Sequence, residues 1–397
     1  MLTVLTINRE RRARESAPFF LIGLLCQPYK SLLNLIYFSS NLFSIIMKTK
    51  TILSCLMSIS LLFALESCSS NSQTTEQKAQ QTAPVSMIRK SVQPWYCCHP
   101  GTSFAELEPF VDKLTCINVF GELEPEFINK CHEKGIQVFY SVGGDEKLID
   151  TEQKMKDRVN EYVSHCIAEK YDGLDIDYEH LPDAFRPQYS DFLRLCAKEL
   201  RAVGKKLSQC VPYTSFMYDD ANTPLFCDPQ VLNETCDYVR VMCYDLYWAP
   251  GIQNPDYQER IDCTGFGPTT TYHWAEKVMQ YWTSCIDLDK LVMALPAYGN
   301  DYAVTGDQVQ GRQVYSLLPD NVKGEMPAPI WLYYEKVNMY VYDATDGQRH
   351  IYYACDGAST KKLLELVDRF GIKTIGFWHF SSISTEIWDE VDKWMKQ

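Results

Sequence analysis

Four acidic residues lie within the segment Tyr171–Glu179, and three of them, Asp175, Asp177 and Glu179, occupy alternate positions. Side chains alternate between the two faces of a β-strand, so these three carboxyl groups would share one face. Carboxylates grouped on a buried strand are costly to keep charged, and proteins retain such groups where they share protons and do chemistry. The alternative, a solvated acidic edge strand, is disfavoured because helical patterns on both sides indicate a covered, central strand.

Polar and aromatic residues also end other predicted strands. The end of one strand carries Met242, Tyr244 and Asp245, and the Tyr244 hydroxyl and the Asp245 carboxyl group could hydrogen-bond a ligand. Further candidates for ligand contact are Ser141, Gly143, Gly144, Trp248, Tyr298 and Trp378. The glycines allow close backbone approach, and the alternative for them is a simple tight turn. The alternative for the tryptophans is a place in the core.

Strand-like and helix-like segments alternate from Val92 onward. The predicted strands are Val92–Cys97, Cys116–Gly121, Gln137–Gly143, Gly173–Glu179, Leu207–Tyr213, Tyr238–Asp245, Leu291–Tyr298 and Thr374–Phe380. The predicted helices are Pro125–Lys134, Lys154–Lys170, Pro187–Lys205, Thr271–Cys285, Thr360–Phe370 and Glu386–Lys396. Eight such units predict an α/β fold, a (β/α)8 TIM barrel. Catalytic residues of these barrels lie at the C-terminal ends of the strands, so the candidate residues should meet there.

The regular spacing breaks between the seventh strand and the seventh helix. The intervening stretch, about residues 300–356, is rich in tyrosine and has Asp346-Gly347 as a hairpin turn signal. It predicts a small β-rich insertion on the rim of the barrel. An insertion at this end of the barrel can form a wall of a substrate groove.

Composition excludes several classes of partner. The net charge of −13 argues against binding to nucleic acid or to an anionic membrane surface. The 13% aromatic content suits a neutral ligand that stacks on rings, such as a sugar. The seven histidines are scattered, and Cys97-Cys98-His99 has no second cluster at ligand spacing, so we expect neither a metal nor another cofactor. The pairing of the sixteen cysteines stays open.

The N-terminal part differs from the rest of the chain. Residues 47–68 combine a basic start, a short apolar run and a small residue before Cys68, which is typical of a bacterial lipoprotein signal. We therefore expect translation to start at Met47, the upstream extension and signal peptide to cover residues 1–67, and Cys68 to be lipidated. A polar, flexible tether would follow over 68–90, and the catalytic barrel would cover 91–397. The expected location is the bacterial cell envelope, periplasm or outer membrane surface, with membrane contact only through the lipid.

The acidic segment resembles the Asp-x-x-Asp-x-Asp-x-Glu signature of glycoside hydrolase family 18, the chitinase family. Asp172, Asp175, Asp177 and Glu179 fill it. The segments 141–144, 242–245 and 296–299 resemble the family's Ser-x-Gly-Gly, Met-x-Tyr-Asp and Pro-x-Tyr-Gly motifs, in the expected order. Within the family, 291–302, 311–314, 342–344 and 351–354 are most similar to the di-N-acetylchitobiase branch. The resemblance covers about residues 92–397.

The resemblance implies a retaining hydrolase of β-1,4-linked N-acetylglucosamine that acts through an oxazolinium intermediate. Glu179 would be the general acid and base, while Asp177 would orient the substrate's 2-acetamido group and Asp175 would share a proton with Asp177. Tyr244 would donate to the acetamido carbonyl, Asp245 would bind the sugar, and Trp378 would lie under it. Asp172 is expected to be structural.

Two alternatives stay open at this point. One is an endo-β-N-acetylglucosaminidase that acts on N-glycans, and the other is a non-catalytic chitin-binding lectin on the same fold. The presence of Asp177, Glu179 and Tyr244 together favours an enzyme. The expected ligand is a chitooligosaccharide or an N-glycan core, and the protein is expected to be a monomer.

Overall fold

The computed structural model describes residues 89–179, 181–212, 226–253, 266–306 and 308–397. All of them lie within one compact unit, Val85–Gln397. The predicted signal segment, the lipidation site Cys68 and most of the tether lie outside the described residues, as does the Tyr213 end of the fifth predicted strand. In the part of the chain that the structure describes, no helix combines the length and apolar character needed to cross a bilayer.

The main sheet is parallel, and over the described residues its nine strands have the order β1-β14-β8-β7-β6-β5-β4-β3-β2. Their bounds are β1 Ser91–Val92, β2 Trp95–Cys97, β3 Cys116–Phe120, β4 Gln137–Gly143, β5 Gly173–Asp177, β6 Lys206–Val211, β7 Tyr238–Met242, β8 Leu291–Pro296 and β14 Thr374–Trp378. From β2 to β8, each strand pairs with the next barrel strand along the chain, as successive β/α units require.

One interrupted segment holds both edges of this sheet. The predicted strand Val92–Cys97 is wrong as one piece, because the ladder breaks at Pro94, which has no N–H to donate. β1 pairs with β14, whereas β2 pairs with β3. The backbone N–H of Gln93 donates to the Ile375 carbonyl at 2.8 Å, and that of Asn118 donates to the Pro94 carbonyl at 3.0 Å. This segment therefore closes the sheet into the predicted barrel.

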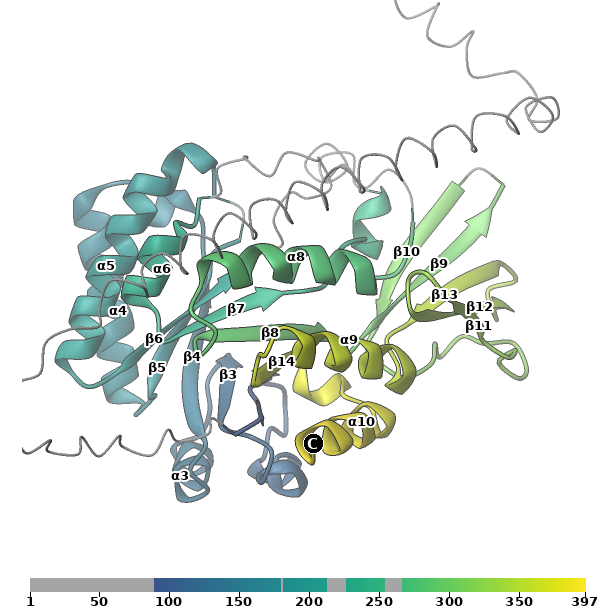
Figure 1. The fold of residues 1–397 in the computed structure, drawn as a ribbon, viewed down its shortest axis with the longest axis horizontal. Helices are drawn as coiled ribbons and strands as arrows, with labels where there is room; N and C mark the ends of the chain where they lie inside the picture. Colours follow the sequence, from purple (N-terminus) through teal and green to yellow (C-terminus); the bar gives the residue numbers. More distant parts are fainter. Residues whose placement is uncertain (1–88, 180, 213–225, 254–265, 307) are drawn as a thin grey trace, which may run out of the picture. The chain divides into compact units, whose positions relative to one another are not determined.

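Helices lie outside the strands (Figure 1). They are α3 Pro125–Glu133, α4 Glu152–Ala168, α5 Arg186–Ala202, α6 Pro229–Thr235, α8 Tyr272–Cys285, α9 Gly357–Arg369 and α10 Thr385–Met395. Short 3-10 turns are Phe104–Glu106, Glu108–Phe110, Glu146–Leu148, Asp183–Phe185, Ala249–Gln253 and Phe380–Ser382. The helix α6 was not predicted. Gly135, Gly204 and Gly371 follow helices with φ of 73°, 71° and 74°, the left-handed conformation typical of C-terminal caps.

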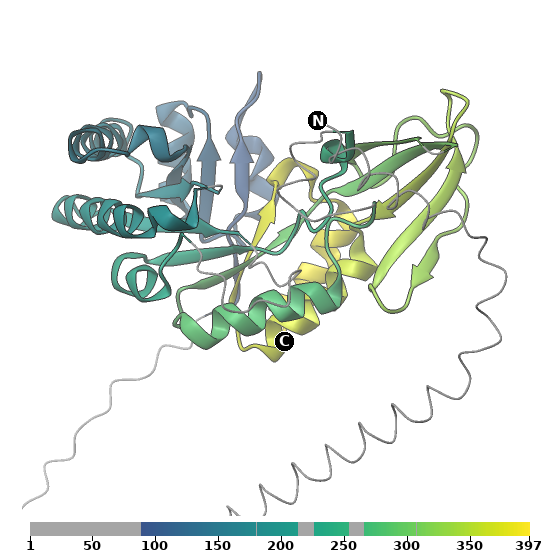
Figure 2. The same ribbon diagram turned by 90° about the horizontal axis from the view of Figure 1, so that it is seen from above.

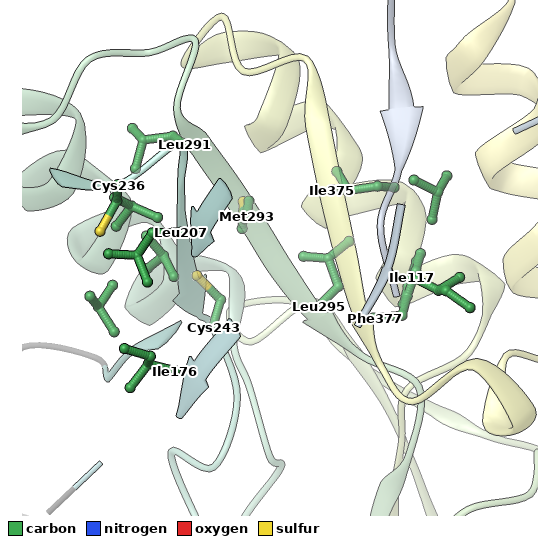
Figure 3. Close-up of a cluster of buried hydrophobic side chains, with 14 of the residues drawn as sticks. Ile117, Ile176, Leu207, Cys236, Cys243, Leu291, Met293, Leu295, Ile375 and Phe377 are labelled. Atoms are coloured by element: carbon green, nitrogen blue, oxygen red, sulfur yellow. The ribbon is translucent and has the colours of Figure 1, made fainter. Parts of the chain in front are cut away.

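The two faces of the barrel strands differ in content. Outward-pointing residues such as Ile176, Leu207 and Met293 pack with the helices in one large apolar cluster, part of which Figure 3 shows. Inward positions of the same strands carry Asp175 and Arg240, both fully buried. The apolar layer between sheet and helices therefore supplies the stability, and the polar residues gather inside the barrel.

The insertion forms a separate antiparallel sheet beside the end of β8 (Figures 1 and 2). Among the described residues it has five strands in the order β10-β9-β13-β12-β11. Their bounds are β9 Gly299–Thr305, β10 Gln308–Val314, β11 Ile330–Leu332, β12 Val337–Asp343 and β13 Arg349–Ala354. β12 and β13 form a hairpin whose turn contains Gly347 at φ 83°, as the Asp346-Gly347 signal predicts. The first two strands, β9 and β10, were not predicted.

Gly173, at the start of β5, offers a test of how tightly the acid-bearing strand is packed. A Cβ atom there would lie 2.7 Å from both the Lys206 carbonyl oxygen and the Phe139 ring, inside any tolerable contact. We expect Gly173→Ala to lower the free energy of unfolding by about 1–3 kcal/mol. The matched control is Gly143→Ala at the end of β4, where the new Cβ would meet the nearest atom at 3.7 Å. Thermal unfolding midpoints check this, and equal losses in both variants would contradict it.

Candidate active site

The predicted site residues meet at the C-terminal ends of the barrel strands. Asp175 and Asp177 lie on β5, and in the strand register Asp177 is the partner of Gly143, the last residue of β4. Trp378 ends β14 opposite Pro296 of β8. β5 ends at Asp177, so Glu179 lies two residues beyond the strand and the predicted strand end is wrong by that amount. The acid thus belongs to the loop that leaves the catalytic face.

Asp175 is fully buried below the site and accepts hydrogen bonds from several strands. Its Oδ2 accepts from Trp95 Nε1 and from Ser141 Oγ, each at 3.0 Å. Its Oδ1 accepts from Arg240 Nε at 3.1 Å, and the Cys210 thiol donates at 3.6 Å to Oδ2. Ser141, which was predicted to contact substrate, is thus buried behind the acid as one of its donors.

One carboxyl oxygen of Asp177 lacks a hydrogen-bond donor among the described residues. Its Oδ1 is buried and has no hydrogen-bond partner among the described residues. Burial raises the pKa of this carboxyl well above its usual range, and the neighbouring charges of Glu179 and Asp175 raise it further. A buried polar atom without a partner is costly, so native structures keep one chiefly where a ligand or a proton completes it.

Burial also raises the pKa of Glu179 above the ordinary value for a glutamic acid. The protonated form of this side chain is therefore more favoured than in a solvent-exposed glutamic acid. Burial raises the pKa of the Tyr244 hydroxyl well above its usual value of 10, and the nearby charges of Asp177 and Glu179 raise it further. Tyr244 thus stays a neutral hydrogen-bond donor.

Asp245 is held by residues from three other segments. Its backbone has φ 59°, a left-handed conformation in which Asp is tolerated better than most residues. Its Oδ1 accepts from the Tyr298 hydroxyl and, at 3.3 Å each, from Thr269 Oγ1 and Gln313 Nε2. Burial raises the pKa of Asp245 to about 6, although these donors oppose the shift. Gln313 lies on β10, so the insertion contributes directly to the site.

Aromatic side chains surround the acids. The Trp378 ring lies 6.1 Å from that of Trp95 and 5.7 Å from that of Phe120, measured between ring centroids. Met242 is buried and packs in an apolar cluster with Trp95 and Tyr244. Trp248 is partly buried and comes just before the 3-10 turn Ala249–Gln253.

The glycine pair after β4 has two different environments. A Cβ on Gly144 would lie 2.2 Å from the Tyr178 ring, so the chain can pass this ring only as glycine. At Gly143 a Cβ would meet the Asp177 carbonyl oxygen at 3.7 Å, an ordinary contact. The tight-turn alternative is therefore insufficient for Gly144, because the side chain of Tyr178, just after β5, leaves no room for a Cβ atom there.

Asp172 lies at the opposite end of β5. Its Oδ2 accepts from the Val138 backbone N–H at 2.8 Å and contacts His132 Nε2 at 2.9 Å. These bonds tie β5 to β4 and to α3, so Asp172 has the structural place that was expected.

Sequence reasoning missed several residues of the site. Arg240 could have been noticed, because it is a charged residue within the apolar strand Tyr238–Met242. It lies two residues before Met242, so strand alternation places both side chains on the same face. Cys210, Thr269 and Gln313 carry no comparable signal, since only the closed barrel and the insertion bring them to the acids. In the ranges described above, no group of three or more His, Cys, Asp or Glu side chains is placed to hold a metal ion, and the twelve cysteines there are free.

Comparison with known proteins agrees with this geometry. The family model for glycosyl hydrolases family 18 matches residues 70–382, so the chain belongs to that family and is a glycosidase. It is similar to di-N-acetylchitobiase of Rattus norvegicus, with 24% identity over 306 residues that cover 67% of this chain and 76% of the relative.

Solved structures of low sequence identity show the same fold. A chitinase from Chromobacterium violaceum matches with a TM-score of 0.63 and 19% identity, over 78% of this chain and 99% of that one. A family 18 N-acetylglucosaminidase from Paenibacillus barengoltzii matches with a TM-score of 0.59 and 15% identity, over 77% and 99% of the two chains. The (β/α)8 prediction is confirmed.

The raised pKa of Asp245 predicts how stability depends on pH. The folded state binds this proton more tightly than the unfolded chain, so the contribution to stability is complete below about pH 4 and is lost as pH rises through about 6. Asp245→Asn removes the titration. The stability of the wild type relative to this variant should therefore fall by roughly 2 kcal/mol between pH 4 and pH 7. Unfolding midpoints across this range check it, and parallel curves would contradict it.

Proposed function

We propose that this glycosidase hydrolyses β-1,4-linked N-acetylglucosamine in chitobiose and short chitooligosaccharides, with retention, by substrate-assisted catalysis. The observation that carries the proposal is the buried Oδ1 of Asp177, which has no hydrogen-bond partner among the described residues and belongs to a carboxyl group near Glu179, an acid with a raised pKa, and near Tyr244, a neutral donor. An amide N–H of the substrate supplies the donor that this oxygen lacks. A 2-acetamido group has such an N–H next to the reacting carbon, whereas a plain hexose does not.

In the first step Glu179 gives its proton to the glycosidic oxygen while the bond from this oxygen to C1 breaks. The acetamido carbonyl oxygen forms a new bond to C1 from the other face, which gives an oxazolinium ion and releases the leaving sugar. Asp177 accepts the amide N–H and offsets the positive charge that develops on the ring. Tyr244 donates its hydroxyl to the acetamido oxygen and fixes its line of attack.

In the second step Glu179 is a carboxylate and takes a proton from a water molecule. The resulting hydroxide equivalent attacks C1 as the oxazolinium ring opens, and the acetamido group is restored. Glu179 is then protonated again and ready for the next substrate. Because C1 is attacked twice from opposite faces, the product keeps the β configuration.

The similarity to the rat chitobiase supports a short oligosaccharide as the substrate. Tyr315, two residues after Gln313, also supports a short oligosaccharide as the substrate. Its ring lies 5.3 Å from the Tyr298 ring, measured between centroids, and 40% of the residue is exposed. The insertion therefore places an accessible aromatic surface next to Asp245. We also propose that Cys68 anchors the protein by a lipid to a bacterial envelope, a proposal that rests on residues 47–68 alone.

Glu179→Gln tests the acid assignment. The amide keeps the shape of the side chain but cannot donate the proton, so turnover should fall at least 10³-fold, on the order expected for loss of general acid catalysis, while sugar binding persists. The measurement is product analysis on N-acetylglucosamine oligomers of two to six units, with calorimetric binding of the same oligomers. Unchanged turnover in the variant would contradict the assignment. A wild type that binds these oligomers without cleaving any of them would contradict the proposed substrate.

A further inference from the structure

Arg240 places a guanidinium group inside the barrel, where its relative exposure is 0%. Its Nε donates to Asp175 Oδ1 at 3.1 Å and to Ser208 Oγ at 2.8 Å. Its Nη1 donates to Gln93 Oε1 at 2.9 Å, and its Nη2 contacts Cys116 Sγ at 3.9 Å. The side chain therefore spans the barrel from β7 to the segment that closes it, and its charge has Asp175 as its counterion.

The surroundings of Asp175 leave little room for a proton. Trp95 Nε1 and Ser141 Oγ both donate to Oδ2, and Arg240 Nε donates to Oδ1. The Cys210 thiol adds a weaker contact to both oxygens, at 3.7 and 3.6 Å. A proton on either oxygen would displace one of these donors and leave the buried guanidinium without its counterion, which is strongly unfavourable.

Asp177 has the opposite surroundings. The ionisable groups that act on it are Glu179, Asp175 and the Cys210 thiol, while Tyr244, two residues after β7, interacts with both Asp177 and Glu179. Its Oδ1 has no donor among the described residues. A proton is therefore accommodated on Asp177 or Glu179 at a much lower cost than on Asp175.

We propose that Arg240 is a positioning residue that holds Asp175 as a carboxylate, so that the catalytic proton is confined to Asp177 and Glu179. This inference rests on the proposed function for its meaning in catalysis, and it replaces the expectation that Asp175 and Asp177 share a proton. The pair of Arg240 and Asp175 has no net charge. Asp177 and Glu179 consequently exchange one proton between them beside a neutral, rigid support.

The test compares Arg240→Gln, which removes the charge, with Arg240→Lys, which keeps it. Without the cation, Asp175 becomes an uncompensated charge beside the pair, and the cluster releases its last proton at higher pH. The alkaline limb of the kcat/KM profile should move up by about one pH unit in Arg240→Gln and stay near its wild-type position in Arg240→Lys. A purely structural role would lower kcat/KM by the same factor at every pH in both variants, and that result would overturn the proposal.

A second readout needs no substrate. In Arg240→Gln the folded cluster of acids should keep its last proton to higher pH than in Arg240→Lys, whereas the unfolded chain has lost that proton above about pH 4, so the stability of Arg240→Gln relative to Arg240→Lys should fall as pH rises from 5 to 8. Parallel unfolding curves for the two variants would overturn the proposal. A wild type that cleaves no oligomer would refute the proposed function, while this comparison would still decide where the proton resides.

If Arg240→Gln does not fold, the double variant Arg240→Gln with Asp175→Asn replaces it. This variant has no charge at either position, and replacement of both members of a buried ion pair is tolerated better than removal of one. The proposal predicts a wild-type alkaline limb, because Asp177 and Glu179 again lie beside a neutral support. A shift of one pH unit or more would show that Asp175 takes part in proton sharing and would overturn the proposal.

Discussion

The ion pair between Arg240 and Asp175 is the interaction on which the rest of the site depends. The barrel buries the acids of β5, and burial of several carboxyl groups together would make them all neutral unless a cation compensated one of them. Arg240 on β7 is this cation: it pairs with Asp175, and both side chains are fully buried inside the barrel. One acid is thereby kept ionised, and the two above it remain free to use a proton in catalysis.

The second constraint is that the insertion has to reach the catalytic face. Asp245 leaves β7 with a left-handed backbone and is fixed by the Tyr298 hydroxyl and by Gln313 of β10. Burial raises the pKa of Asp245 to about 6, and Gln313 of the insertion is one of the donors that oppose this shift. The insertion thus contributes a side chain to the candidate active site.

The residues on β5 and at the strand ends could be predicted from sequence because their chemistry depends on local spacing. Period-two alternation places Asp175 and Asp177 on one face, and an apolar run predicts the strand that carries them. Arg240, Cys210 and Gln313 depend on contacts between strands far apart in sequence, which spacing does not encode. The strands β9 and β10 were missed for a related reason: β10 reads Gln-Val-Gln-Gly-Arg-Gln-Val, a polar pattern that becomes a strand only by pairing with β9.

The central claim is that the substrate's own acetamido group attacks the sugar carbon while Asp177 and Tyr244 hold it. The most direct measurement is the configuration of the first sugar product, followed by proton NMR before mutarotation, with N-acetylglucosamine oligomers and their de-N-acetylated counterparts as substrates. The account predicts that the β anomer forms first from the acetylated oligomers and that a fully de-N-acetylated oligomer is not cleaved. Initial formation of the α anomer, or equal cleavage of both substrates, would contradict it.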